Sequence, residues 1–137
     1  MLEKLSGEIQ GPIEVKGSAE IDGTVRGGAV VIGELDLKGT CDGPLEVRLD
    51  GRATVTGIVR GDVHARGGSL RIRGIIDGRL GIKDGADVQV AVGTVLNGKQ
   101  LQEDGTFVTV TRQGRFSIPE DATMYRPQED GNWTKVS

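Results

Sequence analysis

Glycine recurs at a regular spacing between Gly7 and Gly85, and this repeat constrains the fold more than any other feature of the chain. Each copy is a glycine, five residues, a second glycine, three residues, a third glycine and five further residues, followed by a spacer of variable length. Gly7 and Gly11 are the last two glycines of an incomplete earlier copy. The period is 16 to 18 residues, and the copies begin at Gly17, Gly33, Gly51, Gly68 and Gly85. A period in this range indicates a protein built from stacked structural repeats.

Apolar residues alternate with mostly charged residues or threonine between the glycines, and this alternation predicts strands with one inward face. Three short strands fit each copy, because the glycines between them allow sharp corners. The positions expected to point inward are Ile9, Ile13, Val15, Ala19, Ile21, Val25, Ala29, Val31, Leu35, Leu37, Cys41, Leu45, Val47, Ala53, Val55, Val59, Val63, Ala65, Leu70, Ile72, Ile76, Leu80 and Ile82. We therefore expect an all-β, single-domain, three-sided β-helix of about six turns, in which each turn buries the side chains of its neighbours.

The pattern divides the chain into two regions. We expect residues 1–98 to form the β-helix and residues 99–137 to form capping strands and a loosely ordered tail. Strand candidates in the second region are 106–111 and, more weakly, 115–118. Leu2 and Leu5 precede the repeat, and they either cover the open end of the first turn or touch a lipid surface weakly.

The last turn, residues 85–98, departs from the repeat, because Ala91 stands where the second glycine is expected. The apolar residues also slip by one position relative to Gly85. A one-residue slip exchanges the inner and outer faces of a strand unless a bulge absorbs it. We therefore expect an altered final turn.

Charge is unevenly distributed along the chain, although the net charge is only −3. Residues 1–50 contain five basic and ten acidic side chains, residues 51–84 contain seven and three, and residues 85–137 contain five and seven. The rod is therefore expected to carry an axial charge gradient, which can determine how copies align. Ordinary solvation of an exposed surface explains the same distribution equally well.

Cys41 is the only cysteine and occupies an inward position, so we expect a buried thiol and no intrachain disulfide. This cysteine content is compatible with a reducing compartment. The first ten residues contain no apolar run of signal-peptide length, and no stretch is long enough to span a membrane. We expect a cytoplasmic protein, with peripheral association at the inner membrane face as a weaker possibility.

Catalysis is not indicated by any arrangement of residues, and we expect no enzyme, no cofactor, no metal and no small-molecule substrate. Acyltransferases with left-handed β-helices are the natural enzymatic alternative, but their regular hexapeptide spacing differs from the spacing here. Their chemistry also uses a histidine in a cleft between subunits. His64, the only histidine, lies between the inward residues Val63 and Ala65 and is expected at the surface.

Two groups of charged residues are expected on the outer surface. Glu20 and Asp36 occupy the same position on adjacent turns, where paired carboxylates could bind a cation, but nothing else converges on them. Basic side chains at positions 71 and 73 are expected on one face, one turn away from threonines at positions 54 and 56. No aromatic residues are interleaved with them, so we expect no nucleic-acid partner.

The glycine-bounded turns GSAEIDGTVRG, GRATVTGIVRG and GSLRIRGIIDG resemble those of the bactofilins, the polymer-forming bacterial cytoskeletal proteins. The resemblance covers residues 7–98. It implies a right-handed β-helix that stacks end to end into filaments without nucleotide, often at the membrane.

We therefore expect a self-assembling structural protein, a cytoskeletal scaffold that polymerises with itself through the ends of the β-helix. The physical reason is that the backbone groups of a terminal turn lack partners, and another copy can supply them. The expected interface consists of Ile9, Ile13 and Val15 at one end and Val88, Val90, Val92, Phe107 and Phe116 at the other. In the alternative, Phe107 and Phe116 cap the second end, which leaves a dimer through the first turn or a solitary β-helical binding module or spike.

Overall fold

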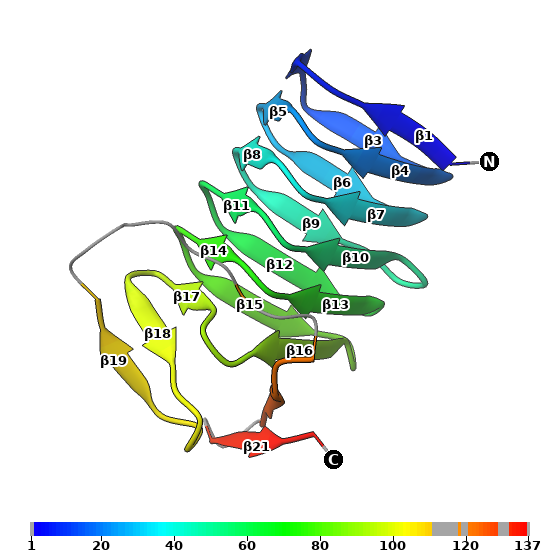
Figure 1. Ribbon diagram of the computed structural model, residues 1–137. Helices are drawn as coiled ribbons and strands as arrows, with labels where there is room; N and C mark the ends of the chain where they lie inside the picture. Colours follow the sequence, from blue (N-terminus) through cyan, green and yellow to red (C-terminus); the bar gives the residue numbers. More distant parts are fainter. Residues whose placement is uncertain (1, 111–117, 119–120, 129–131, 137) are drawn as a thin grey trace.

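The computed structural model describes residues 2–110, 118, 121–128 and 132–136, and it shows a three-sided parallel β-helix (Figure 1). The described residues form strands and turns and contain no helix. Each turn of the chain, called a coil below, passes once through three sheets, and successive coils stack on one another. The all-β, three-sided fold expected from the repeat is confirmed.

Three parallel sheets, named A, B and C, form the sides of the β-helix. The parallel strands of sheet A are β1 (Leu2–Leu5), β4 (Ser18–Ile21), β7 (Glu34–Leu37), β10 (Arg52–Val55), β13 (Ser69–Ile72) and β16 (Asp87–Ala91). Those of sheet B are β2 (Glu8–Gln10), β5 (Thr24–Arg26), β8 (Thr40–Asp42), β11 (Ile58–Val59), β14 (Ile75–Ile76) and β17 (Val95–Leu96). Those of sheet C are β3 (Ile13–Val15), β6 (Ala29–Val31), β9 (Leu45–Val47), β12 (Val63–Arg66) and β15 (Leu80–Lys83). Coil 1 contains β1, β2 and β3, and the later coils follow in the same order.

The core is a stack of aliphatic side chains along the axis of the β-helix. One register column of sheet A shows the arrangement, because all its members are at most 5% exposed: Ala19, Leu35, Ala53, Leu70 and Val88. Small and large residues alternate over its first four members, so neighbouring side chains can interdigitate. The expected period-two alternation of buried and outward residues is confirmed in coils 2 to 5 of sheet A.

The first coil is more complete than the sequence indicated. Residues 2–5 form β1, which pairs with β4 over its whole length, with Leu5 opposite Ile21. These residues were expected to form a lead-in outside the repeat. No glycine of the repeat precedes β1, so the glycine spacing did not predict this strand. Its pairing with β4 of coil 2 is what places it in the β-helix.

The one-residue slip in the last coil is absorbed at a corner and does not exchange the faces of the strand. Val88 lies opposite Leu70 and Val90 lies opposite Ile72, so both remain inward. The extra residue is accommodated in the turn before β16, where the Ala86 amide donates to the Lys83 carbonyl over 3.2 Å. Gly85 within this turn has a φ of 73°. The inward direction of Val88 and Val90 is thus the same as that of the regular coils.

The C-terminal region caps two of the three sheets with antiparallel strands. Strands β18 (Lys99–Leu101) and β19 (Phe107–Thr109) extend sheet B beyond β17. Strands β20 (Met124–Pro127) and β21 (Trp133–Lys135) extend sheet A beyond β16. The expectation of capping strands after residue 98 is therefore supported. The expectation of a loosely ordered tail after residue 118 is wrong for β20 and β21. Most of the weaker candidate, 115–118, lies outside the described residues.

Sheet C ends at β15, because no described strand pairs with its outer edge. Leu80 is half-buried and Ile82 is 38% exposed, although both occupy inward positions opposite Val63 and Ala65. The burial expected for Ile82 is therefore only partial. The physical reason is that an inward side chain needs coils on both sides, and no described strand of sheet C lies beyond β15.

Cys41 is 1% exposed, and its thiol lies 3.7 Å from the carbonyl oxygen of Gly43. The expected buried position is confirmed, with Val25 and Val59 as its register neighbours. Burial raises the pKa of the Cys41 thiol from 9.0 to about 11, and the nearby Asp42 carboxylate adds to the increase. The thiol is thus protonated and poorly reactive at neutral pH.

This pKa predicts that the protein loses stability in alkali. Between about pH 9 and pH 11 the folded state holds the Cys41 proton while the unfolded state releases it, so the free energy of unfolding falls as pH rises. The loss contributed by this group is about 2 to 3 kcal/mol, and it is absent below about pH 9. Urea unfolding from pH 7 to pH 11 should show this decline in the wild type and a smaller one in Cys41→Val. Parallel profiles for the two proteins would contradict the prediction.

Candidate assembly surfaces

The N-terminal end of the β-helix is formed by β1, β2 and β3, each the outermost strand of its sheet. Among the described residues, no strand pairs with their outer edges. Ile9 and Ile13 are half-buried, Val15 is 6% exposed, and all three pack toward the core. This end therefore presents unpaired backbone groups together with partly exposed apolar side chains.

Glu3 protects one side of this end against pairing. Glu3 lies opposite Ala19, so a carboxylate occupies the register column that is aliphatic in every later coil of sheet A. The Glu3 side chain is exposed. An inward-directed charge on a terminal strand opposes the addition of another strand, because pairing would bury that charge. The edges in sheets B and C carry no such charge at their inward positions.

The C-terminal end is largely covered by the chain's own capping strands. Val88 and Val90 are at most 1% exposed, and β20 pairs with β16 beside them. Val92 is half-buried, and its amide donates to the Thr123 carbonyl over 2.8 Å. Contact between these three residues and a second copy would require β20 to move, so their place in an interface stays a prediction.

Aromatic residues hold the cap against the last coils. The rings of Phe107 and Trp133 meet edge to face, with centroids 5.1 Å apart and planes at 65°. Tyr125 is 6% exposed, and its hydroxyl donates to the Glu103 carbonyl. The alternative in which Phe107 covers this end is supported, whereas Phe116 lies outside the described residues. Tyr125 and Trp133 were not expected in the cap, because they stand in short polar segments without a repeat.

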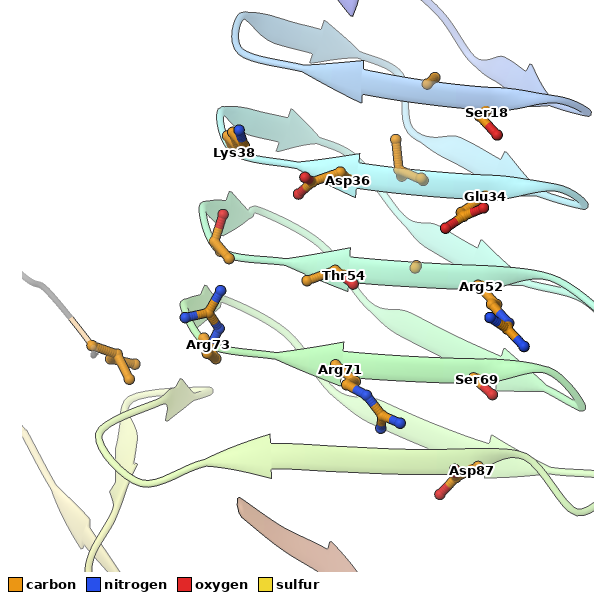
Figure 2. A pocket seen from close by; sticks show the side chains of 15 residues that line it. Ser18, Glu34, Asp36, Lys38, Arg52, Thr54, Ser69, Arg71, Arg73 and Asp87 are labelled. Atoms are coloured by element: carbon orange, nitrogen blue, oxygen red, sulfur yellow. The ribbon is translucent and has the colours of Figure 1, made fainter. Parts of the chain in front are cut away.

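The outer face of sheet A is hollowed into a groove of about 1090 Å³ (Figure 2). Hydroxyl side chains such as Thr54 and Ser69 lie among longer charged ones. The acidic residues Glu34 and Asp36 stand on β7, whereas the arginines stand on the next two strands. These arginines are Arg52 on β10 and, on or just after β13, Arg71 and Arg73.

Only some charges of this face are paired within the chain. Lys38 forms an ion pair with Glu20, and this hydrogen bond lowers the pKa of the Glu20 carboxyl and raises that of the Lys38 ammonium. Asp87 pairs with Arg126 over 3.0 Å. Within the described part of the chain, the three groove arginines form no ion pair or side-chain hydrogen bond.

The expected placement of the outward residues is confirmed. Glu20 lies opposite Asp36, but Glu20 is engaged by Lys38, so the two carboxylates do not form a cation site by themselves. Arg71 lies opposite Thr54, as expected. Among the described residues there is no group of three or more His, Cys, Asp or Glu side chains that could hold a metal ion.

His64 is half-buried between the fully buried Val63 and Ala65, on the outer face of sheet C. It lies opposite Glu46 and Gly81 in the register. The described residues include no helix of the length and apolar character needed to cross a membrane.

Comparison of the chain with protein-family models, with curated proteins and with solved structures gave no match. The class of protein is therefore defined by its fold alone, a capped three-sided parallel β-helix.

Proposed function

We propose that this chain is a self-assembling structural protein, a rod-shaped scaffold subunit that associates through the N-terminal end of its β-helix without nucleotide. The observation that carries the proposal is the asymmetry of the two ends. Coil 1 leaves three strand edges unpaired among the described residues, whereas β18 to β21 cover sheets A and B at the other end. A second copy can pair with the open edges and bury Ile9 and Ile13 against their counterparts.

The capped C-terminal end limits assembly to pairs in this proposal. Pairing of two N-terminal ends stops at a dimer, because both copies use the same surface and no second such surface is left to bind a third copy. Filaments of the kind implied by the resemblance to bactofilins require in addition that the cap moves away from coil 6. A cytoplasmic location and weak association with a membrane surface belong to the same proposal, and the membrane association is what the resemblance to bactofilins implies.

Ile9→Arg should weaken end-to-end association, because it places a charge where two apolar end coils would meet. We expect the dissociation constant to rise at least about tenfold, a shift typical of losing one well-packed interface residue. Analytical ultracentrifugation over a range of protein concentrations, with negative-stain imaging of the rods, measures the effect. Gln10→Arg is the matched control, because Gln10 is the next residue of β2 and is exposed.

Glu3→Ala should have the opposite effect and strengthen association, because it removes the charge that opposes pairing on β1. Thermal melts must show that each variant keeps the fold. A wild-type protein that stays monomeric at high concentration, together with a monomeric Glu3→Ala, would contradict the scaffold. It would favour the second candidate, a solitary β-helical binding module. The observation behind that candidate is that Glu3 and the C-terminal cap each oppose the growth of a sheet.

A further inference from the structure

We propose that the outer face of sheet A is a second self-association surface, on which two copies pair side by side with their rods antiparallel. The proposal does not depend on association through the N-terminal end. It commits to a second copy of this chain as the occupant of the groove, because the charges of this face are complementary to themselves in one arrangement. The register of the sheet defines that arrangement.

The outward side chains of sheet A form a regular grid. The first column, from coil 2 to coil 6, is Ser18, Glu34, Arg52, Ser69 and Asp87. The second column is Glu20, Asp36, Thr54, Arg71 and Gln89. The third column stands just after the strands, where each amide donates to the preceding coil, and it consists of Asp22, Lys38, Thr56 and Arg73 in coils 2 to 5.

Apart from Lys38, which is paired with Glu20, this grid separates the two signs of charge along the rod. The carboxylates of the three columns stand in coils 2 and 3, except for Asp87, which is paired with Arg126. The arginines of the three columns all stand in coils 4 and 5. The boundary runs between β7 and β10, with Glu34 on one side and Arg52 on the other (Figure 2). The axial charge gradient expected from the sequence is thus concentrated on one face.

A two-fold axis parallel to the strands, placed at this boundary, brings opposite charges together. Rotation about such an axis keeps each column and reverses the order of the coils. Coil 3 of one copy then faces coil 4 of the other, and coil 2 faces coil 5. Glu34 faces Arg52 and Asp22 faces Arg73. Glu20, which is also paired with Lys38 of its own copy, faces Arg71, and symmetry repeats each opposition. At the remaining positions of coils 2 to 5, a hydroxyl side chain of one copy faces either a charged or a hydroxyl side chain of the other copy.

Other face-to-face arrangements oppose like charges. Moving the axis onto coil 4 opposes Asp36 to Arg71, but it also places Arg52 against its own copy and Lys38 against Arg73. A two-fold axis parallel to the rod places Asp36 against Asp36 and Arg71 against Arg71. Like charges held together across an interface are unfavourable, so the grid selects the antiparallel arrangement centred between β7 and β10.

The dimensions of the face indicate a weak association that depends on salt. Six strands spaced by about 4.8 Å, each about 13 Å long, cover less than the roughly 800 Å² per partner that a stable complex uses. Exposed ion pairs are screened by salt, so pairing should be favoured at low ionic strength.

Complementary charge reversal tests the proposal directly. The basic positions are changed in one variant, Arg71→Glu with Arg73→Glu, and the acidic positions in another, Glu20→Lys with Asp22→Lys. Sedimentation velocity at low ionic strength should show dimers for the wild type and at least about tenfold weaker association for either variant alone. An equimolar mixture of the two variants should recover dimers, because every reversed charge then faces a reversed partner. High salt should dissociate the wild-type dimer.

The control variant carries Arg60→Glu and Arg79→Glu, which change the net charge equally on exposed residues outside the groove. It should dimerise like the wild type. Ile9→Arg should also keep this salt-sensitive dimer, and this result separates lateral pairing from association through the ends. A mixture of the two charge-reversed variants that stays monomeric would overturn the proposal. A low-salt dimer that is lost in Ile9→Arg and retained in Arg71→Glu/Arg73→Glu would also overturn it.

Discussion

Val55→Asp is expected to unfold the protein or to destabilise it by about 4 kcal/mol or more, because it buries an unpaired carboxylate. Val55 is fully buried at the centre of the rod, between Leu37 and Ile72 in the register. The core here is aliphatic and offers no hydrogen-bond donor among these neighbours. The strands around the new carboxylate cannot turn to expose it to solvent, because each of them is paired with a neighbouring strand on both sides. Urea unfolding followed by circular dichroism measures the loss.

Thr54→Asp is the matched control for this change. Thr54 precedes Val55 in β10, is half-buried and points outward into the groove. The same new side chain should cost less than about 1 kcal/mol there, and part of that cost comes from Asp36 on the neighbouring strand. A larger loss in Thr54→Asp than in Val55→Asp would mean that the inner and outer faces of β10 have been exchanged.

Most of the fold could be predicted from the sequence because two independent signals agree. The glycine period indicated stacked coils, and the alternation of apolar residues indicated which side chains point inward. Leu35, Leu37 and Val55 were placed by this alternation, and all are at most 2% exposed. The side-chain period of a strand is two, so a single known inward residue determines its neighbours.

The two ends of the rod could not be predicted in the same way. β1 has no glycine before it, and only its pairing with β4 shows that residues 2–5 complete a coil. β20 and β21 are antiparallel and polar, so their positions depend on the exposed edge of β16 and not on their own pattern. Ile82 fits the pattern of inward residues, but burial there depends on a further coil, which sheet C lacks among the described strands.

The candidate surfaces were predicted in part. Alternation placed Arg71 one coil from Thr54 and Glu20 beside Asp36, and the register confirms both. Whether a charge is paired depends on side-chain geometry, which periodicity does not report. The ion pair of Lys38 with Glu20, and the lack of a partner for the groove arginines among the described residues, therefore became visible only in the structure.

Gly57→Ala is expected to cost about 3 kcal/mol or more, because it forces a side-chain carbon into the backbone of the preceding coil. A Cβ atom at Gly57 would lie 2.6 Å from the Lys38 carbonyl oxygen and closer still to that of Gly39. The Gly39 carbonyl cannot move away freely, since it accepts a hydrogen bond from the Ile58 amide over 3.0 Å. The same close approach recurs at the equivalent corner of other coils, at Gly23, Gly39 and Gly74.

Gly17→Ala, at a different corner of the coil, tests whether lack of space, and not glycine flexibility alone, explains the glycines at the Gly57 corner. A Cβ atom at Gly17 would have no neighbour within 4 Å, and its φ lies outside the left-handed region. Removing glycine there restricts the unfolded chain without creating a clash, so stability should change by less than about 1 kcal/mol and can increase. Thermal and urea unfolding of both variants compare the two corners. If Gly17→Ala and Gly57→Ala both changed stability by less than about 1 kcal/mol, the coils would not be stacked closely enough at Gly57 to exclude a methyl group, and the tight stacking of β-helix corners would be refuted.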